Sequence, residues 1–180
     1  MEQKSGESGE TILQVPSLFV RWEEVPHWQQ DNHYITSNYR RPSGSYRGSF
    51  ASLFRLHNET VNIYSHLIPA ILSLPVSLVL YLKLRDRYAR ADAIDAIVIG
   101  LFLLSFALAL CMSAIYHTIS NHSPRVNRLG NQLDYVGIVL LIAGSFVPSI
   151  FYGFWCDSRL ILLYLIMVSQ RWSFEPEWQV

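Results

Sequence analysis

Residues 96–116 read AIVIGLFLLSFALALCMSAIY, an unbroken run of 21 residues without a formal charge. An α-helix rises 1.5 Å per residue, so about 20 apolar residues cross the roughly 30 Å hydrocarbon layer of a membrane. A buried helix of a soluble protein would explain one such run equally well. Two further uncharged runs of similar length flank it, at residues 61–82 and 135–155. Three such runs in series predict a membrane protein.

The composition of the 180 residues supports the same class of protein. Charged residues make up 16% of the chain, whereas an average soluble domain has about 25%. We therefore expect an all-α membrane protein with three complete transmembrane helices at about residues 61–83, 94–117 and 133–155. The formal net charge is zero, so no basic excess favours nucleic acid as a partner.

The two ends of the chain differ from its centre. A fourth apolar run, residues 160–168, stops after nine residues, which is too short to span a membrane. We expect an aborted fourth helix followed by an atypical tail at residues 169–180, as in a truncated chain. An interfacial segment anchored by Trp172 and Trp178 is the alternative. Residues 1–50 are expected to form a polar N-terminal tail, with a docked segment around residues 22–39 and no cleavable signal peptide.

Ionisable side chains in membrane spans are costly and are therefore candidates for function. Ser113 and His117 are four residues apart, which places them on one helix face. Asp134 opens the third predicted span, and the connection at residues 118–132 brings it to the same side of the membrane as His117. This placement suits a metal ligand with a water-positioning carboxylate. It equally suits a plain His–Asp pair, an interfacial histidine or a packing serine.

A second polar cluster precedes the first span. Glu59, Asn62 and His66 recur at three- and four-residue spacing, so one helix face gathers them. One interpretation is a polar network that caps a membrane helix. The other is a set of residues that support the ligands of the same site, or a cytosolic gate to it.

Three blocks of the sequence then resemble a known family: HNETVNIYSHL at 57–67, SAIYHTISNHS at 113–123 and NQLDYVGIVLLIAGSFVPSIFYGF at 131–154. Their order and spacing are similar to those of the progestin and adiponectin Q receptor family, which is related to the hemolysin III proteins and includes fungal members. The upstream segment WEEVPHWQQDNHYITSNYR at 22–40 resembles the segment before the membrane in that family. The resemblance identifies a fungal-type member that lacks its C-terminal part, with a partial transmembrane domain at residues 51–168.

The resemblance implies a seven-helix bundle, here partial, with a Zn²⁺ ion near the cytosolic face. His117 falls on one zinc ligand, Asp134 on the aspartate beside the zinc-bound water, and Ser113 on the family serine. Two further ligands are expected from a His-x-x-x-His motif in the seventh helix, and no histidine follows His122 in this sequence. The site is thus expected to be incomplete, because zinc sites need at least three protein ligands. A makeshift site of His66, His117 and Asp134 is the alternative.

The resemblance also implies a receptor-like zinc protein, linked to lipid or metal homeostasis signalling, that binds a membrane lipid or a sphingolipid-like ligand. A zinc-dependent lipid amide hydrolase of the ceramidase kind is the first alternative. In that reading Asp134 activates water and Ser113 stabilises the oxyanion, and we expect this chain to be inactive. The second alternative is a non-catalytic fragment that associates with itself or a full-length partner, with close helix approach at Gly100, Gly137 and Gly144.

The orientation in the membrane follows from the resemblance, which implies a cytosolic N-terminus in the endomembrane system or the plasma membrane. The positive-inside rule gives a divided answer. Basic residues lie both before the first span, at Arg40, Arg41, Arg47 and Arg55, and in the loop after it, at Lys83, Arg85, Arg87 and Arg90. We expect the upstream group to offset the loop.

Overall fold

The structure, a computed structural model, describes residues 18–87 and 93–171. Residues 1–17 of the expected N-terminal tail, and Trp172 and Trp178 of the C-terminal tail, lie outside the described residues. Helices dominate it, and its one sheet has two short strands. In chain order the elements are β1 (Phe19–Val20), η1 (Trp22–Glu24), η2 (His27–Gln29), β2 (Tyr39–Arg40), α1 (Tyr46–Ala51), η3 (Ser52–Phe54), α2 (Thr60–Arg87), α3 (Ala93–Ile119), α4 (Pro124–Gly153) and α5 (Ser158–Arg171).

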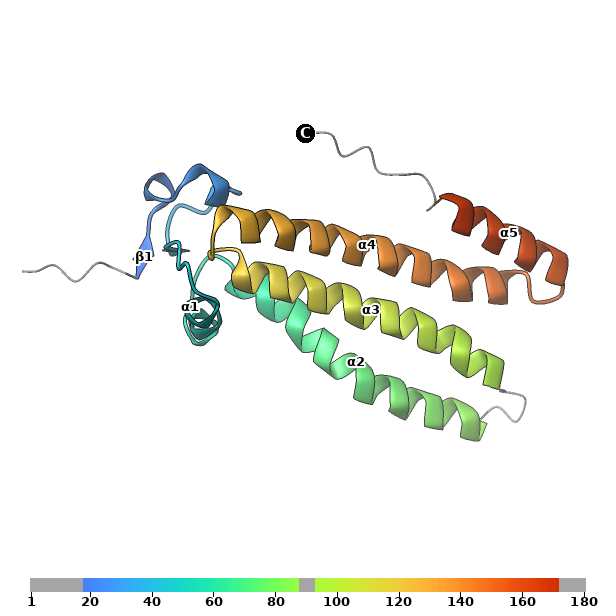
Figure 1. The fold of residues 1–180 in the computed structure, drawn as a ribbon. Coiled ribbons are helices and arrows are strands. Elements are labelled where there is room, and N and C mark those ends of the chain that lie inside the picture. Colours follow the sequence, from blue (N-terminus) through green and yellow to red (C-terminus); the bar gives the residue numbers. More distant parts are fainter. Residues whose placement is uncertain (1–17, 88–92, 172–180) are drawn as a thin grey trace, which may run out of the picture.

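Three long helices lie side by side as an antiparallel set, with α3 between α2 and α4 (Figure 1). Segments Thr60–Lys83, Ala93–Ile119 and Pro124–Gly153 are each long and apolar enough to span a membrane. The prediction of an all-α membrane protein with three complete spans is therefore confirmed. Helix α5 has 14 residues and turns back along α4, and at 1.5 Å per residue it is too short to span.

The third long helix begins nine residues before the start predicted at residue 133, and this boundary was wrong. Ser123 caps the helix by accepting a hydrogen bond from the Val126 N–H, and proline occupies the first helical position, where its missing N–H costs nothing. The connection from α3 is therefore much shorter than the predicted 118–132. Span-length reasoning detects only the uncharged part of a helix, so it missed the polar first turns of α4.

Helices α3 and α4 approach closely along a row of glycines spaced seven residues apart on α4. A Cβ atom at Gly137 would lie 3.1 Å from the Ala109 Cα, and one at Gly144 would collide with the Ser105 side chain. A Cβ at Gly130 would lie 2.8 Å from the Tyr116 ring. Small residues permit this approach between membrane helices. Gly100, also expected at a close contact, faces open space.

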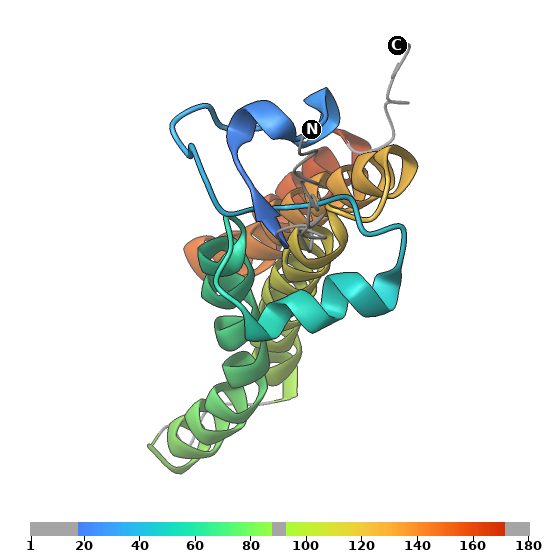
Figure 2. The same ribbon diagram turned by 90° about the vertical axis from the view of Figure 1, so that its left-hand side faces the viewer.

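Residues 18–58 form a small folded unit, here called the N-terminal cap, at one end of the three long helices (Figures 1 and 2). Strands β1 and β2 pair antiparallel, with Val20 opposite Tyr39. Val20, Val25 and Tyr39 form its apolar centre, and Trp22 and Ile35 pack against them. The expected polar tail thus holds a folded segment that reaches well beyond the docked part predicted at 22–39.

Arg40 fastens the N-terminal cap to the bundle. Its guanidinium donates hydrogen bonds to the backbone carbonyls of His117, at 2.6 Å, and Thr118, at 2.8 Å. It also donates to the hydroxyls of Ser120 and Ser52, at 3.0 and 2.9 Å. The carbonyls at a helix C-terminus lack intrahelical partners and carry partial negative charge, so a buried cation stabilises the end of α3.

Candidate functional site

The predicted site residues come together at the end of the bundle nearest the N-terminal cap. Because α2 and α3 run antiparallel, the row Glu59, Asn62 and His66 lies against the row Ser113 and His117. Two hydrogen bonds join the rows: Glu59 Oε2 lies 2.9 Å from His117 Nδ1, and His66 Nδ1 lies 2.7 Å from Ser113 Oγ. The sequence predicted a common membrane side for these residues, and the structure adds these direct contacts.

Glu59 is buried and accepts hydrogen bonds on both carboxylate oxygens. The Asn58 amide donates to Oε1 at 2.6 Å, and the Asn62 amide and His117 Nδ1 contact Oε2 at 2.8 and 2.9 Å. Burial raises the pKa of Glu59, but the hydrogen bonds from His117 and Asn62 and the positive charge of Arg40 outweigh it. The pKa of Glu59 therefore lies below its ordinary value, and the side chain is ionised at neutral pH.

An ionised carboxylate has no proton to donate, so His117 contributes the Nδ1–H of this pair. In the neutral imidazole, the lone pair then lies on Nε2, which faces Asp134 Oδ2 on α4 at 3.9 Å. That distance exceeds a hydrogen bond. A histidine whose Nδ1–H is held by a carboxylate, with a free Nε2, has the arrangement of metal-ligating histidines in proteins.

The residues present do not by themselves complete a zinc site. Within residues 18–87 and 93–171, no three histidine, cysteine, aspartate or glutamate side chains are arranged to hold a metal ion. The makeshift set of His66, His117 and Asp134 is not assembled, since the two imidazole centroids are 6.3 Å apart and His66 contacts Ser113. The described residues offer one imidazole and a nearby carboxylate, fewer than the three ligands that zinc requires.

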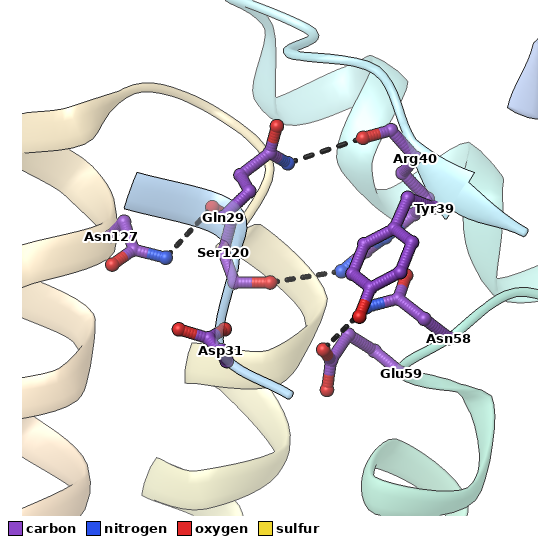
Figure 3. A pocket seen from close by; sticks show the side chains of 8 residues that line it. All are labelled: Gln29, Asp31, Tyr39, Arg40, Asn58, Glu59, Ser120 and Asn127. Atoms are coloured by element: carbon purple, nitrogen blue, oxygen red, sulfur yellow. Dashed lines mark hydrogen bonds between the residues drawn. The ribbon is translucent and has the colours of Figure 1, made fainter. Parts of the chain in front are cut away.

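Several polar residues of the N-terminal cap adjoin this site and were not predicted from the sequence. A polar cavity of about 10 Å³ lies beside Glu59 (Figure 3). The cavity has room for a water-sized molecule but not for a lipid. Burial and the charge of Glu59 raise the pKa of Asp31, which lines the cavity. Its other lining residues are Gln29, Tyr39, Arg40, Asn58, Ser120 and Asn127. In the sequence, the only indication of this region was the family resemblance of the block at residues 22–40.

His57 supports Glu59 from the backbone side. Its Nδ1 accepts a hydrogen bond from the Glu59 N–H at 3.1 Å, so the neutral ring carries its proton on Nε2. Burial, with the positive charge of Arg40, lowers the pKa of His57 to about 4.

This shift predicts a pH dependence of stability. An unfolded histidine has a pKa of about 6.5, so between pH 6.5 and 4 the unfolded chain binds a proton that the folded chain does not. We expect His57 to lower the free energy of unfolding in detergent by about 2 kcal/mol as the pH falls through this window, after allowance for screening by solvent. In the variant His57→Asn, whose Oδ1 replaces the accepting Nδ1, the slope should be shallower by this amount. An equal slope in both proteins would contradict the assignment to His57.

Comparison with known proteins shows the family of the chain. Residues 54–171 match the family described as "Haemolysin-III related". The chain is 42% identical over 149 residues to the ADIPOR-like receptor IZH2 of Saccharomyces cerevisiae, an alignment covering 82% of this chain and 47% of that protein. It is 40% identical over 148 residues to the adiponectin receptor protein of Drosophila melanogaster, covering 82% of this chain and 33% of that protein.

The chain also resembles a human protein. The progestin and adipoQ receptor family member 3 of Homo sapiens is 36% identical over 148 residues, covering 82% of this chain and 47% of that protein. The chain thus spans less than half the length of each of these three relatives. Together with the three membrane spans, these matches show that the chain belongs to the haemolysin-III related family of membrane proteins, alongside the adiponectin-receptor-like and progestin and adipoQ receptor proteins.

Proposed function

We propose that this chain contributes the N-terminal part of a receptor-like zinc site in a membrane protein that responds to a lipid ligand. His117 acts as one ligand of Zn²⁺ through Nε2, Glu59 holds its ring, and Asp134 lies beside the ion. The remaining donors come from outside this sequence, either in a longer chain or in a full-length partner. Zinc bound there would order the end of the bundle and polarise a bound water.

The contact between Glu59 and His117 carries this proposal. The Glu59 carboxylate already accepts hydrogen bonds from the amides of Asn58 and Asn62, and it also contacts His117 Nδ1. A histidine with a purely structural role does not need a buried carboxylate as its partner. Because Glu59 is ionised, it fixes the Nδ1–H tautomer of His117, and Nε2 of the same ring then faces Asp134. The receptor-like role is supported by the relatives, which are an ADIPOR-like receptor and an adiponectin receptor protein.

A hydrolytic function has less support in the described residues. The cavity beside Glu59 is far smaller than a lipid amide, and Ser113 is occupied by a 2.7 Å hydrogen bond with His66. We therefore place Ser113 and His66 as a pair that fixes the register between α2 and α3. Asp134 keeps the role of a carboxylate beside the metal.

Zinc content tests this function. The chain purified alone in detergent should hold well under one zinc per molecule, because it lacks two ligands. Residues 1–168, joined to the remaining C-terminal part of the S. cerevisiae ADIPOR-like receptor, should bind one zinc per chain. In the joined protein, His117→Ala should abolish binding, and Glu59→Gln should weaken it by about 10- to 100-fold, as the loss of an orienting carboxylate does.

His122 provides the matched control. It lies five residues after His117. Its ring packs tilted against that of Tyr46, with ring centroids 4.2 Å apart, and its Nδ1 contacts the Ser123 hydroxyl. The variant His122→Ala should retain full zinc content. Equal zinc in the His117→Ala and His122→Ala proteins would disprove the proposed ligand.

A further inference from the structure

The short helix α1 and the turn η3 bury a polar side and expose an aromatic side, whereas a surface helix of a soluble protein does the opposite. The polar side faces inward, where Ser49 is fully buried and donates a hydrogen bond to Asn121 at 2.8 Å. The aromatic side faces outward: Tyr46, Phe50 and Phe54 recur every four residues and are 53%, 48% and 90% exposed. An aromatic row of this kind is unfavourable in water and needs a cover.

The direction of α1 indicates what covers it. Figure 1 shows α1 almost end-on while the three long helices run across the view, and Figure 2 shows it lengthwise. Helix α1 thus lies roughly perpendicular to the spans, at the level where α2 begins at Thr60 and α3 ends at Ile119. If α2, α3 and α4 cross the bilayer, α1 lies parallel to its surface, as interfacial helices do.

A cavity of about 430 Å³ lies beside this helix, between the strands and the loop after α3. Its wall includes the cationic side chains of Arg41 and Arg55 and the apolar side chains of Leu18 and Phe19. Among the described residues that line it, none is acidic. This volume is within the range of small-molecule pockets, and its mixture of cations with apolar groups matches a phosphate joined to a hydrocarbon part.

We propose that the N-terminal cap binds the headgroup of an anionic phospholipid in this cavity, with Arg41 and Arg55 at the phosphate. The aromatic row of α1 and η3 enters the boundary between headgroups and acyl chains. Arginine side chains near a membrane surface attract anionic lipids, and their forked guanidinium groups fit a phosphate. The bound lipid would fix the cap that carries Arg40, and so stabilise the end of α3 next to His117. This inference does not depend on zinc.

Thermal unfolding in detergent micelles tests the proposal. Phosphatidylserine added to the micelles should raise the melting temperature of the purified chain by about 3 °C or more, whereas phosphatidylcholine should not. The double variant Arg41→Gln/Arg55→Gln should bind phosphatidylserine about 30-fold more weakly, since each arginine near the surface contributes about fivefold. Should the double variant fail to fold, Arg55→Gln alone should show the fivefold loss.

The control removes the same charge from the other end of α2, where Lys83 and Arg85 are exposed. The variant Lys83→Gln/Arg85→Gln should keep the full response to phosphatidylserine. An equal response in all three proteins would overturn the proposal, and so would equal stabilisation by phosphatidylcholine. Stabilisation by inorganic phosphate to the same extent would also overturn it, because the cavity would then bind a free anion.

Discussion

Gly144→Ala should destabilise the folded chain by about 1 to 3 kcal/mol, the usual cost of forcing an extra group into a packed interface. The new methyl group would collide with the Cβ and Oγ of Ser105 on α3. Rotation of the side chain could move the Oγ away, but the Cβ is fixed by the backbone. The helices would have to separate, which would loosen the α3–α4 pairing that holds Asp134 near His117. Unfolding in detergent, followed by circular dichroism, measures this loss.

Gly100 and Ser105 provide the controls for this prediction. A Cβ at Gly100 meets no atom within 4 Å, so Gly100→Ala should be neutral or should stabilise by up to about 1 kcal/mol through higher helix propensity. The double variant Ser105→Gly/Gly144→Ala moves the small residue to the facing helix and should recover stability relative to Gly144→Ala. Equal effects of alanine at positions 100 and 144 would contradict the close approach.

Arg40→Met should release the N-terminal cap from the bundle. The methionine keeps the apolar part of the side chain but leaves the carbonyls of His117 and Thr118 without their donor. Loss of one partner from a buried charged network costs about 3 kcal/mol, so the cap should open about 100-fold more often. Limited trypsin digestion detects this opening, because cleavage follows the population of the open form.

Arg47→Met is the matched control for the cap. Arg47 lies on α1 and is exposed, so its loss removes the same charge from the same unit without touching the end of α3. Its digestion rate after Arg41 and Arg55 should stay close to that of the unchanged protein. If both variants are digested equally fast, Arg40 does not fasten the cap.

The three spans could be predicted from the sequence because bilayer thickness fixes the length of an uncharged run. The same rule could not find the start of α4 at Pro124, where Arg125 and Arg128 interrupt the apolar pattern but continue the helix. Nor could it find the fold of the N-terminal cap, since two-residue strands such as β1 and β2 leave no periodic signal.

The sequence predicted which residues form the candidate site, but it did not predict most of the contacts between them. Helical spacing placed Ser113 and His117 on one face, and Glu59 and His66 on another, and antiparallel connection brought the faces to one end. The direct pairing of Glu59 with His117 depends on the register of α2 against α3, which spacing within one helix does not set. The bond from Arg40 to the His117 carbonyl joins residues 77 positions apart, with no local pattern to reveal it.

The tautomer of His117 tests the central claim most directly, namely that buried Glu59 holds this ring with Nε2 free. Nitrogen NMR of the chain labelled with ¹⁵N-histidine, with the resonance assigned through His117→Ala, distinguishes the two ring nitrogens. In the neutral ring and without metal, we predict the proton on Nδ1 and none on Nε2, and Glu59→Gln should disturb this preference. A proton on Nε2, unchanged by Glu59→Gln, would show that the carboxylate does not hold the ring.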